Sequence, residues 1–94
     1  MAADSLPLLV FFTSTRSGPA RRMESLLAHI ARKRRGSLRV RQVDVDERPD
    51  IAKRFRIAEV PSLALVKGQK VVARLEGRTT APKIESMIGS HLDD

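Results

Sequence analysis

The chain of 94 residues contains no cysteine, no tryptophan and no tyrosine. Without cysteine there is no disulfide, no thiolate metal ligand and no thiol nucleophile. Aromatic residues make up only 3% of the chain, so it has almost no stacking platforms for single-stranded nucleic acid. No apolar run is long enough to span a bilayer, and Met1-Ala2-Ala3-Asp4 lacks the basic start of a secretory signal. We therefore expect a soluble, cytoplasmic protein with no membrane contact.

Positive charge is in excess, with a formal net charge of +7. Such an excess suits phosphate neutralisation, which supplies most non-specific affinity for nucleic acids. The scarcity of aromatics makes nucleic acid the weaker interpretation, and a solvated, arginine-rich surface explains the charge equally well. An apolar content of 41% and a mean hydropathy of −0.24 indicate a globular chain. We predict a flexible tail at 1–5 and a single domain at 6–94.

Seven segments carry the pattern of regular secondary structure. Residues 6–12 are apolar on both alternations, which is typical of a strand buried on both faces, and residues 19–35 have one apolar stripe at helical spacing. The full prediction is strands at 6–12, 38–45, 62–66 and 71–76, helices at 19–35 and 49–55, a last helix capped by Thr80, and a hairpin turn at 67–69. The order β-α-β-α-β-β-α predicts an α/β fold, a four-stranded mixed sheet with helices on both faces.

The stretch that joins the first strand to the first helix is the candidate functional region. Ser17 is a favourable N-cap residue, and Pro19 is tolerated in a first helical turn. A helix start offers unpaired N–H groups and the positive end of the helix dipole. Ser17 with this dipole and Arg21 could hold an anion, although a plain N-cap is the simpler role for Ser17.

The order of these parts resembles the thioredoxin family. Ser17-Gly18-Pro19-Ala20 opens a helix after a buried strand, and Val60-Pro61-Ser62 follows some forty residues later. The family's motif is Trp-Cys-Gly-Pro-Cys, and its second landmark is a cis-proline after Ile, Val or Thr. The resemblance runs from Leu8 to Leu92 and implies a thioredoxin-like fold without the extra N-terminal strand and helix of full-length thioredoxins.

The same resemblance implies that dithiol chemistry has been lost. Ser17 and Ala20 stand where the family has its two cysteines, and disulfide exchange needs a thiolate at the first position and a second cysteine to resolve the mixed disulfide. The family's buried acid falls on Phe11, its tryptophan on Arg16 and the preceding aromatic on Thr13. Engineered removal of the cysteines would have left these supporting residues in place, so we favour a natural redox-silent protein over an engineered one. We expect no catalytic residue, no enzyme activity and no cofactor.

The resemblance leaves a binding groove between three loops. In the family, a substrate's extended backbone lies against the residue before the cis-proline, so main-chain hydrogen bonds supply the affinity. We expect a protein or an extended peptide as the partner, with acidic peptides favoured by the arginines; the alternative is that Pro61 merely starts a strand. The predicted groove residues are Arg16, Ser17, Gly18, Pro19, Val60, Pro61, Glu76, Gly77 and Arg78. Glutathione-using relatives of this fold bind a small thiol near the same helix start, so the resemblance implies a small thiol at Ser17 as the alternative ligand.

The run Arg32-Lys33-Arg34-Arg35 is the other candidate surface. Cations at a helix C-terminus followed by Gly36 are explained by the helix dipole and by glycine at the C′ position. The run is also an alternative surface for nucleic acid or an acidic protein, and such binding would weaken steeply with salt.

No metal site is expected. His29 and His91 are isolated on different predicted helices. Asp44, Asp46 and Glu47 cluster after the second strand, where acids more often cap the next helix than bind a cation.

Overall fold

A computed structural model describes residues 6–92 of the chain. The predicted tail at 1–5 lies outside these residues. The elements in chain order are β1 Leu8–Thr13, α1 Gly18–Lys33, β2 Arg39–Asp44, α2 Pro49–Arg54, β3 Ser62–Lys67, β4 Lys70–Glu76 and α3 Ala81–Leu92. The predicted order of strands and helices is confirmed. None of the helices in this part of the chain is long and apolar enough to cross a membrane.

The four strands form one mixed sheet in the order β2-β1-β3-β4. β1 and β2 are parallel, because the whole of α1 lies between them as a crossover. β1 pairs antiparallel with β3, and β3 pairs antiparallel with β4. β1 is therefore a central strand, which explains why its residues are apolar on both alternations.

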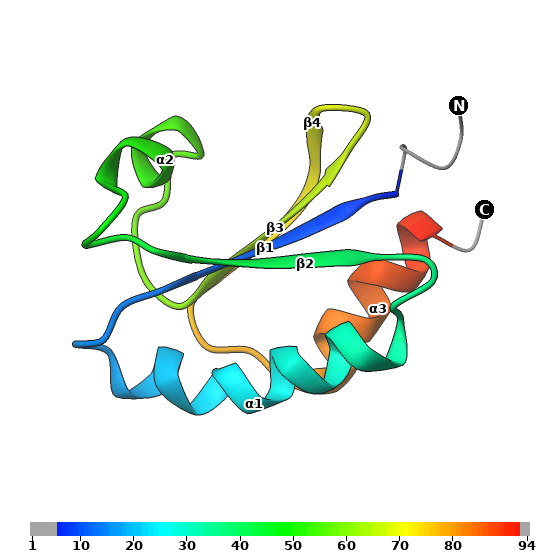
Figure 1. Ribbon diagram of the computed structural model, residues 1–94, viewed down its shortest axis with the longest axis horizontal. Helices are drawn as coiled ribbons and strands as arrows, with labels where there is room; N and C mark the ends of the chain where they lie inside the picture. The colour runs from blue at the N-terminus through cyan, green and yellow to red at the C-terminus, as the bar shows by residue number, and fades with distance from the viewer. Residues whose placement is uncertain (1–5, 93–94) are drawn as a thin grey trace.

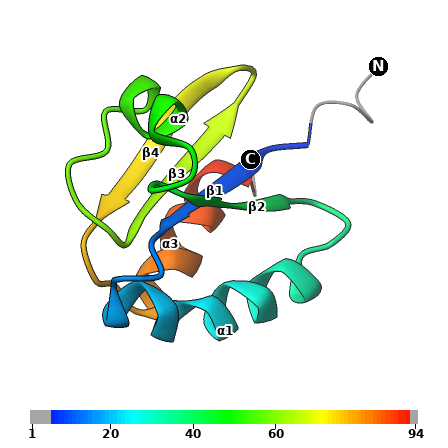
Figure 2. The same cartoon turned by 60° about the vertical axis from the view of Figure 1, so that its left-hand side comes forward.

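The two faces of the sheet are covered unequally (Figures 1 and 2). α1 and α3 lie together on one face, where Leu9 and Phe11 of β1 pack against buried side chains of both helices. Of the helices in the described residues, the short α2 alone lies on the other face (Figure 1). There the ring of Phe12 meets that of Phe55 with centroids 5.2 Å apart, and Val10 and Ala64 complete the buried cluster. Helices on both faces are confirmed, but one face is only partly covered.

Two predicted boundaries are wrong for physical reasons. The hairpin turn has two residues, Gly68 and Gln69, because both adopt positive φ (60° and 67°), the geometry of the tight turns that match strand twist. α1 ends at Lys33 rather than near residue 35. Its C-cap is Arg34, whose carbonyl accepts the N–H groups of Ser37 and Leu38, so Gly36 does not serve as the C′ residue.

Candidate functional site

The strand register brings three loops to one end of the sheet. Phe12 near the end of β1 lies opposite Ser62 at the start of β3, and Ser62 lies opposite Glu76 at the end of β4. The loop before α1, the loop before β3 and the loop after β4 therefore meet beside the start of α1 (Figures 1 and 2). The predicted groove segments, far apart in the sequence, are brought together by this register.

Ser17 and Ala20 have structural roles in the first turn of α1. Ser17 is the N-cap, and its Oγ accepts a hydrogen bond from the Ala20 N–H at 3.1 Å. The Ala20 side chain is fully buried, whereas Gly18 is exposed. The position of the family's second cysteine is thus occupied by a methyl group that packs inside the protein.

Beneath this turn there is an apolar core where the family has an acid. Phe11 is fully buried between the sheet and the helices. Thr13, further along the same side of β1, is also buried, and its Oγ1 has no hydrogen-bond partner among residues 6–92. Neither position offers a group that could take or give a proton near a reacting atom.

The loop before β3 contains a cis Val60–Pro61 peptide bond. The Pro61 carbonyl accepts the Gly77 N–H at 2.8 Å, and the Ser62 Oγ donates to the Glu59 carbonyl at 2.7 Å. The first bond joins two of the three loops, and the second lies within the loop before β3. Val60 is half-buried, and within residues 6–92 neither its N–H nor its carbonyl makes a hydrogen bond.

Charges of both signs surround the loops. Arg16 and Arg78 are exposed. The Glu59 carboxylate lies directly over Gly77, where a Cβ would approach it to 2.7 Å; Gly77 also has a φ of +82°, so glycine is required on two grounds. Glu76 pairs with Arg74, Oε2 to Nε at 3.4 Å. Glu59 was not predicted as part of the site, because it becomes a neighbour of Gly77 only through the bond between the two loops.

A second connection that the sequence did not indicate ties the site to the end of β2. The buried Ser14 donates from its Oγ to Asp46 Oδ2 at 2.5 Å and accepts the Arg16 N–H at 3.1 Å. Asp44 Oδ1 accepts the Asp46 N–H at 2.8 Å. The acids therefore hold turns, and the predicted capping of α2 is wrong, since its N-cap residue is Arg48 and no side chain caps this helix start. Within residues 6–92 no cluster of histidine and acidic residues could hold a metal ion.

The basic run after α1 is partly neutralised by α3. Lys33 Nζ lies 3.4 Å and Arg34 Nη2 2.9 Å from the Glu85 carboxylate, whereas Arg32 and Arg35 are exposed. Burial raises the pKa of Glu85, but the hydrogen bonds from Arg34 and Lys33 outweigh it, so the pKa lies below its ordinary value. The run is therefore part of the contact between two helices as well as a surface.

Glu85→Gln is expected to lower the free energy of unfolding at pH 7 by about 0.5–1 kcal/mol, because this pair is only partly shielded from water. A carboxyl whose folded pKa is lowered stabilises the fold above its unfolded pKa of about 4.3 and loses that contribution as pH falls through the folded pKa. Urea unfolding at pH 7 and at pH 3 measures both effects. Glu24→Gln on α1 is the control, and an equal loss at both pH values would contradict the role of the charge.

Comparison with known proteins places the chain in a family. The thioredoxin family model matches residues 1–90. The chain is 37% identical over 75 residues to a thioredoxin of Mycobacterium tuberculosis, covering 80% of this chain and 65% of that protein. It is 35% identical over 75 residues to the bifunctional thioredoxin reductase/thioredoxin of Mycobacterium leprae, of which it spans only 16%. The chain therefore spans slightly less than two thirds of the mycobacterial thioredoxins and a small part of the bifunctional protein.

Solved structures agree with this assignment. A mutant thioredoxin of Halobacterium salinarum has the same fold, with a TM-score of 0.87 at 23% identity, covering 97% of this chain and 79% of that one. The germline-specific thioredoxin Deadhead of Drosophila melanogaster also gives a TM-score of 0.87, at 26% identity, covering 96% of this chain and 85% of that one. With its matching family model, fold and Ser-Gly-Pro-Ala turn, this cysteine-free chain belongs to the thioredoxin family.

Proposed function

We propose that this protein is a redox-silent binding module that holds an extended segment of a partner protein in the groove between the three loops. The observation that carries the proposal is the free backbone of Val60, between the start of α1 and the loop at Gly77. Both hydrogen-bonding groups of Val60 lack a partner within residues 6–92, and an extended peptide would satisfy them by strand addition. Dithiol activity is absent because the chain has no cysteine.

The arrangement of charges refines the kind of partner. Arg16 and Arg78 favour acidic side chains, whereas Glu59 over Gly77 favours a basic or polar one. A segment with charges of both signs therefore fits this end of the sheet better than a uniformly acidic one. A small thiol or anion at Ser17 is the weaker proposal, since the Ser17 Oγ already accepts the Ala20 N–H.

A pull-down from the lysate of the source organism, with nuclease added, tests the groove. Val60→Arg fills it with a charged side chain, and Val72→Arg is the matched control, because Val72 is exposed on β4. We expect a partner retained by the parent chain and by Val72→Arg but reduced at least tenfold by Val60→Arg, since a filled groove cannot accept a backbone. Circular dichroism checks that each variant is folded.

Two results would contradict the proposal. If the folded Val60→Arg variant still retains the partner, the partner does not bind in the groove. A partner lost only when Arg32 and Arg35 are replaced by glutamine uses the exposed part of the basic run instead. Because Val60 is half-buried, Arg78→Glu serves as a second variant: its side chain is exposed, so the change reverses the charge at the groove without disturbing the core.

A further inference from the structure

β2 leaves one side of its backbone open. It is an edge strand of the sheet, and its bonds to β1 begin at the Arg39 N–H, which reaches the Pro7 carbonyl at 2.9 Å, and end at the Val45 N–H. Successive residues of a strand direct their backbone groups to opposite sides, so Val40 and Gln42 direct theirs away from β1. Within residues 6–92 no strand pairs with this side, and such a row is a template for an added strand.

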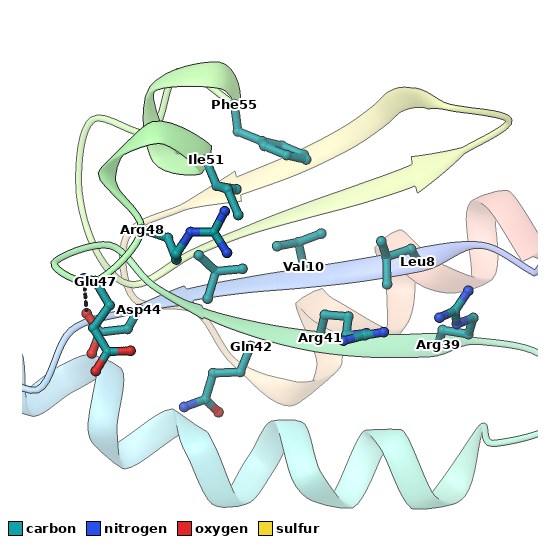
Figure 3. Close-up of a pocket in the computed structure, with 11 residues that line it drawn as sticks. Leu8, Val10, Arg39, Arg41, Gln42, Asp44, Glu47, Arg48, Ile51 and Phe55 are labelled. Carbon is teal, nitrogen blue, oxygen red and sulfur yellow. Dashed lines mark hydrogen bonds between the residues drawn. The ribbon is translucent and has the colours of Figure 1, made fainter.

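A hollow of about 460 Å³ lies beside this open edge, between β1, β2 and α2. It exists because α2 has only six residues and covers only part of its face of the sheet (Figure 3). Its apolar lining comes from the two strands and from α2: Leu8, Val10, Val43, Ile51 and Phe55. Val10 is buried, and the other four side chains are half-buried.

Two arginines of β2 line the same hollow. Arg39 and Arg41 lie opposite Leu8 and Val10 in the register, so all four are on the α2 face of the sheet. Both arginines are exposed, and neither has an ion-pair partner in the described part of the chain. Asp44 and Glu47 lie at the other end of the hollow, where the Asp44 carboxylate accepts the Glu47 N–H (Figure 3).

The charge pattern selects between a second copy and another protein. If two copies joined by antiparallel β2 edges with both hollows on one face, Arg41 would lie opposite Arg39 or Arg41 of the other copy in the registers that pair Val40 with Val40 or with Gln42. In the register that pairs Gln42 with Gln42, Arg41 would lie opposite Val43 and would again have no acidic partner. Like charges directly opposite each other destabilise a strand pair, whereas opposite charges stabilise it. The edge therefore disfavours its own copy and favours an acidic strand.

We propose that the open edge of β2 and the adjoining hollow bind an extended segment of another protein as an antiparallel fifth strand. Acidic residues of this segment lie opposite Arg39 and Arg41, and an apolar residue lies opposite Val43, over Ile51 and Phe55. We expect the added strand to be antiparallel, because antiparallel pairing is slightly more stable per residue than parallel pairing. This surface shares no residue with the Val60 groove and does not depend on the function proposed for it.

A labelled peptide, Gly-Ser-Leu-Thr-Glu-Val-Glu-Ser-Gly, has the required pattern and is the probe. Its Leu lies opposite Val43, its glutamates opposite Arg41 and Arg39, and its Val opposite Val40, where the two residues exchange both backbone bonds. N-methylation of that Val removes an N–H group that donates to β2. N-methylation of the glutamate opposite Arg41 is the control, because its N–H points away from β2. Binding is followed by the fluorescence anisotropy of the labelled peptide as protein is added up to millimolar concentration, and contact is followed by amide hydrogen exchange of the protein.

We expect saturable binding, slower exchange at Val40 and Gln42, and loss of binding only with N-methyl-Val. Arg39→Glu/Arg41→Glu is expected to weaken the peptide about tenfold and to strengthen a peptide with lysine in place of both glutamates by a similar factor. Arg32→Glu/Arg35→Glu is the matched control, because it makes the same change in net charge on exposed residues of another surface.

Four outcomes would overturn the proposal. The first is that the acidic peptide does not bind to the folded parent chain at millimolar concentration. The second is that both double variants weaken the acidic peptide equally, which would mean attraction by net charge alone. The third is protection at Val40 and Gln42 that appears without peptide as protein concentration rises, which would make a second copy the occupant. Protection at Val60 instead would assign the peptide to the loop groove and equally exclude this edge.

Discussion

Phe11→Ala is expected to lower the free energy of unfolding by about 3–5 kcal/mol. Phe11 is fully buried between the sheet and the α1–α3 layer, in contact with the largest cluster of apolar side chains in the fold. Removing its ring leaves a cavity that the rigid sheet cannot close. Single domains are stable by only about 5–15 kcal/mol, so this one change would remove a large part of the total.

Urea unfolding measures this loss, with Phe55→Ala as the matched control. Phe55 is half-buried on the opposite face, where its ring meets that of Phe12 at a tilt of 56°, so we expect a loss of about 1–2 kcal/mol. If Phe11→Ala is too unstable to measure, Phe11→Leu is expected to lose less stability than Phe11→Ala and more than a swap that conserves volume, because it leaves a smaller cavity. Equal losses for Phe11→Ala and Phe55→Ala would show that the two faces contribute alike, contrary to the burial.

Ser17→Cys/Ala20→Cys is expected to create a redox-active dithiol in a chain that has none. The side chain at position 17 already reaches the backbone of residue 20, with Ser17 Oγ to Ala20 N at 3.1 Å. A thiol at this helix start faces unpaired N–H groups and the positive end of the dipole, which stabilise a thiolate. We expect the pKa of the thiol at position 17 to fall from about 8.5 to about 7 or lower.

Reduction of insulin by dithiothreitol measures the gain of activity, and thiol counting after oxidation measures the disulfide. The parent chain is expected to give the rate of dithiothreitol alone. Ser17→Cys by itself is the control: it should form mixed disulfides with glutathione but show no turnover, because no second thiol resolves them. A folded double variant that keeps two free thiols after oxidation would contradict the inferred geometry.

Much of the fold could be predicted from local patterns. The apolar run of β1 reflects burial on two faces, and the apolar stripe of α1 reflects burial on one side. The Ser17-Gly18-Pro19 start of α1 reflects the need to cap the helix. The absence of cysteine excluded dithiol chemistry without any structure. The two boundaries that were missed, at Arg34 and Gly68, depend on φ angles and capping bonds that residue type predicts less well.

Most of the site could not be predicted, because its contacts join residues far apart in the chain. The bond from Ser14 to Asp46 and the position of Glu59 over Gly77 exist only after the strands align. The pairing of Glu85 with Lys33 and Arg34 requires α1 and α3 to lie on the same face. The open edge of β2 is likewise a property of strand order, since nothing in the pattern of residues 39–44 says which strand lies at the edge.

The sequence by itself therefore determined the elements, the capped helix start and the lack of a thiol, because spacing, capping and composition are read along the chain. The tertiary structure alone decided which loops meet, which arginines are neutralised and which surfaces stay open. The physical reason is that hydrogen bonds and ion pairs act over a few ångströms in space, and the strand register sets those distances.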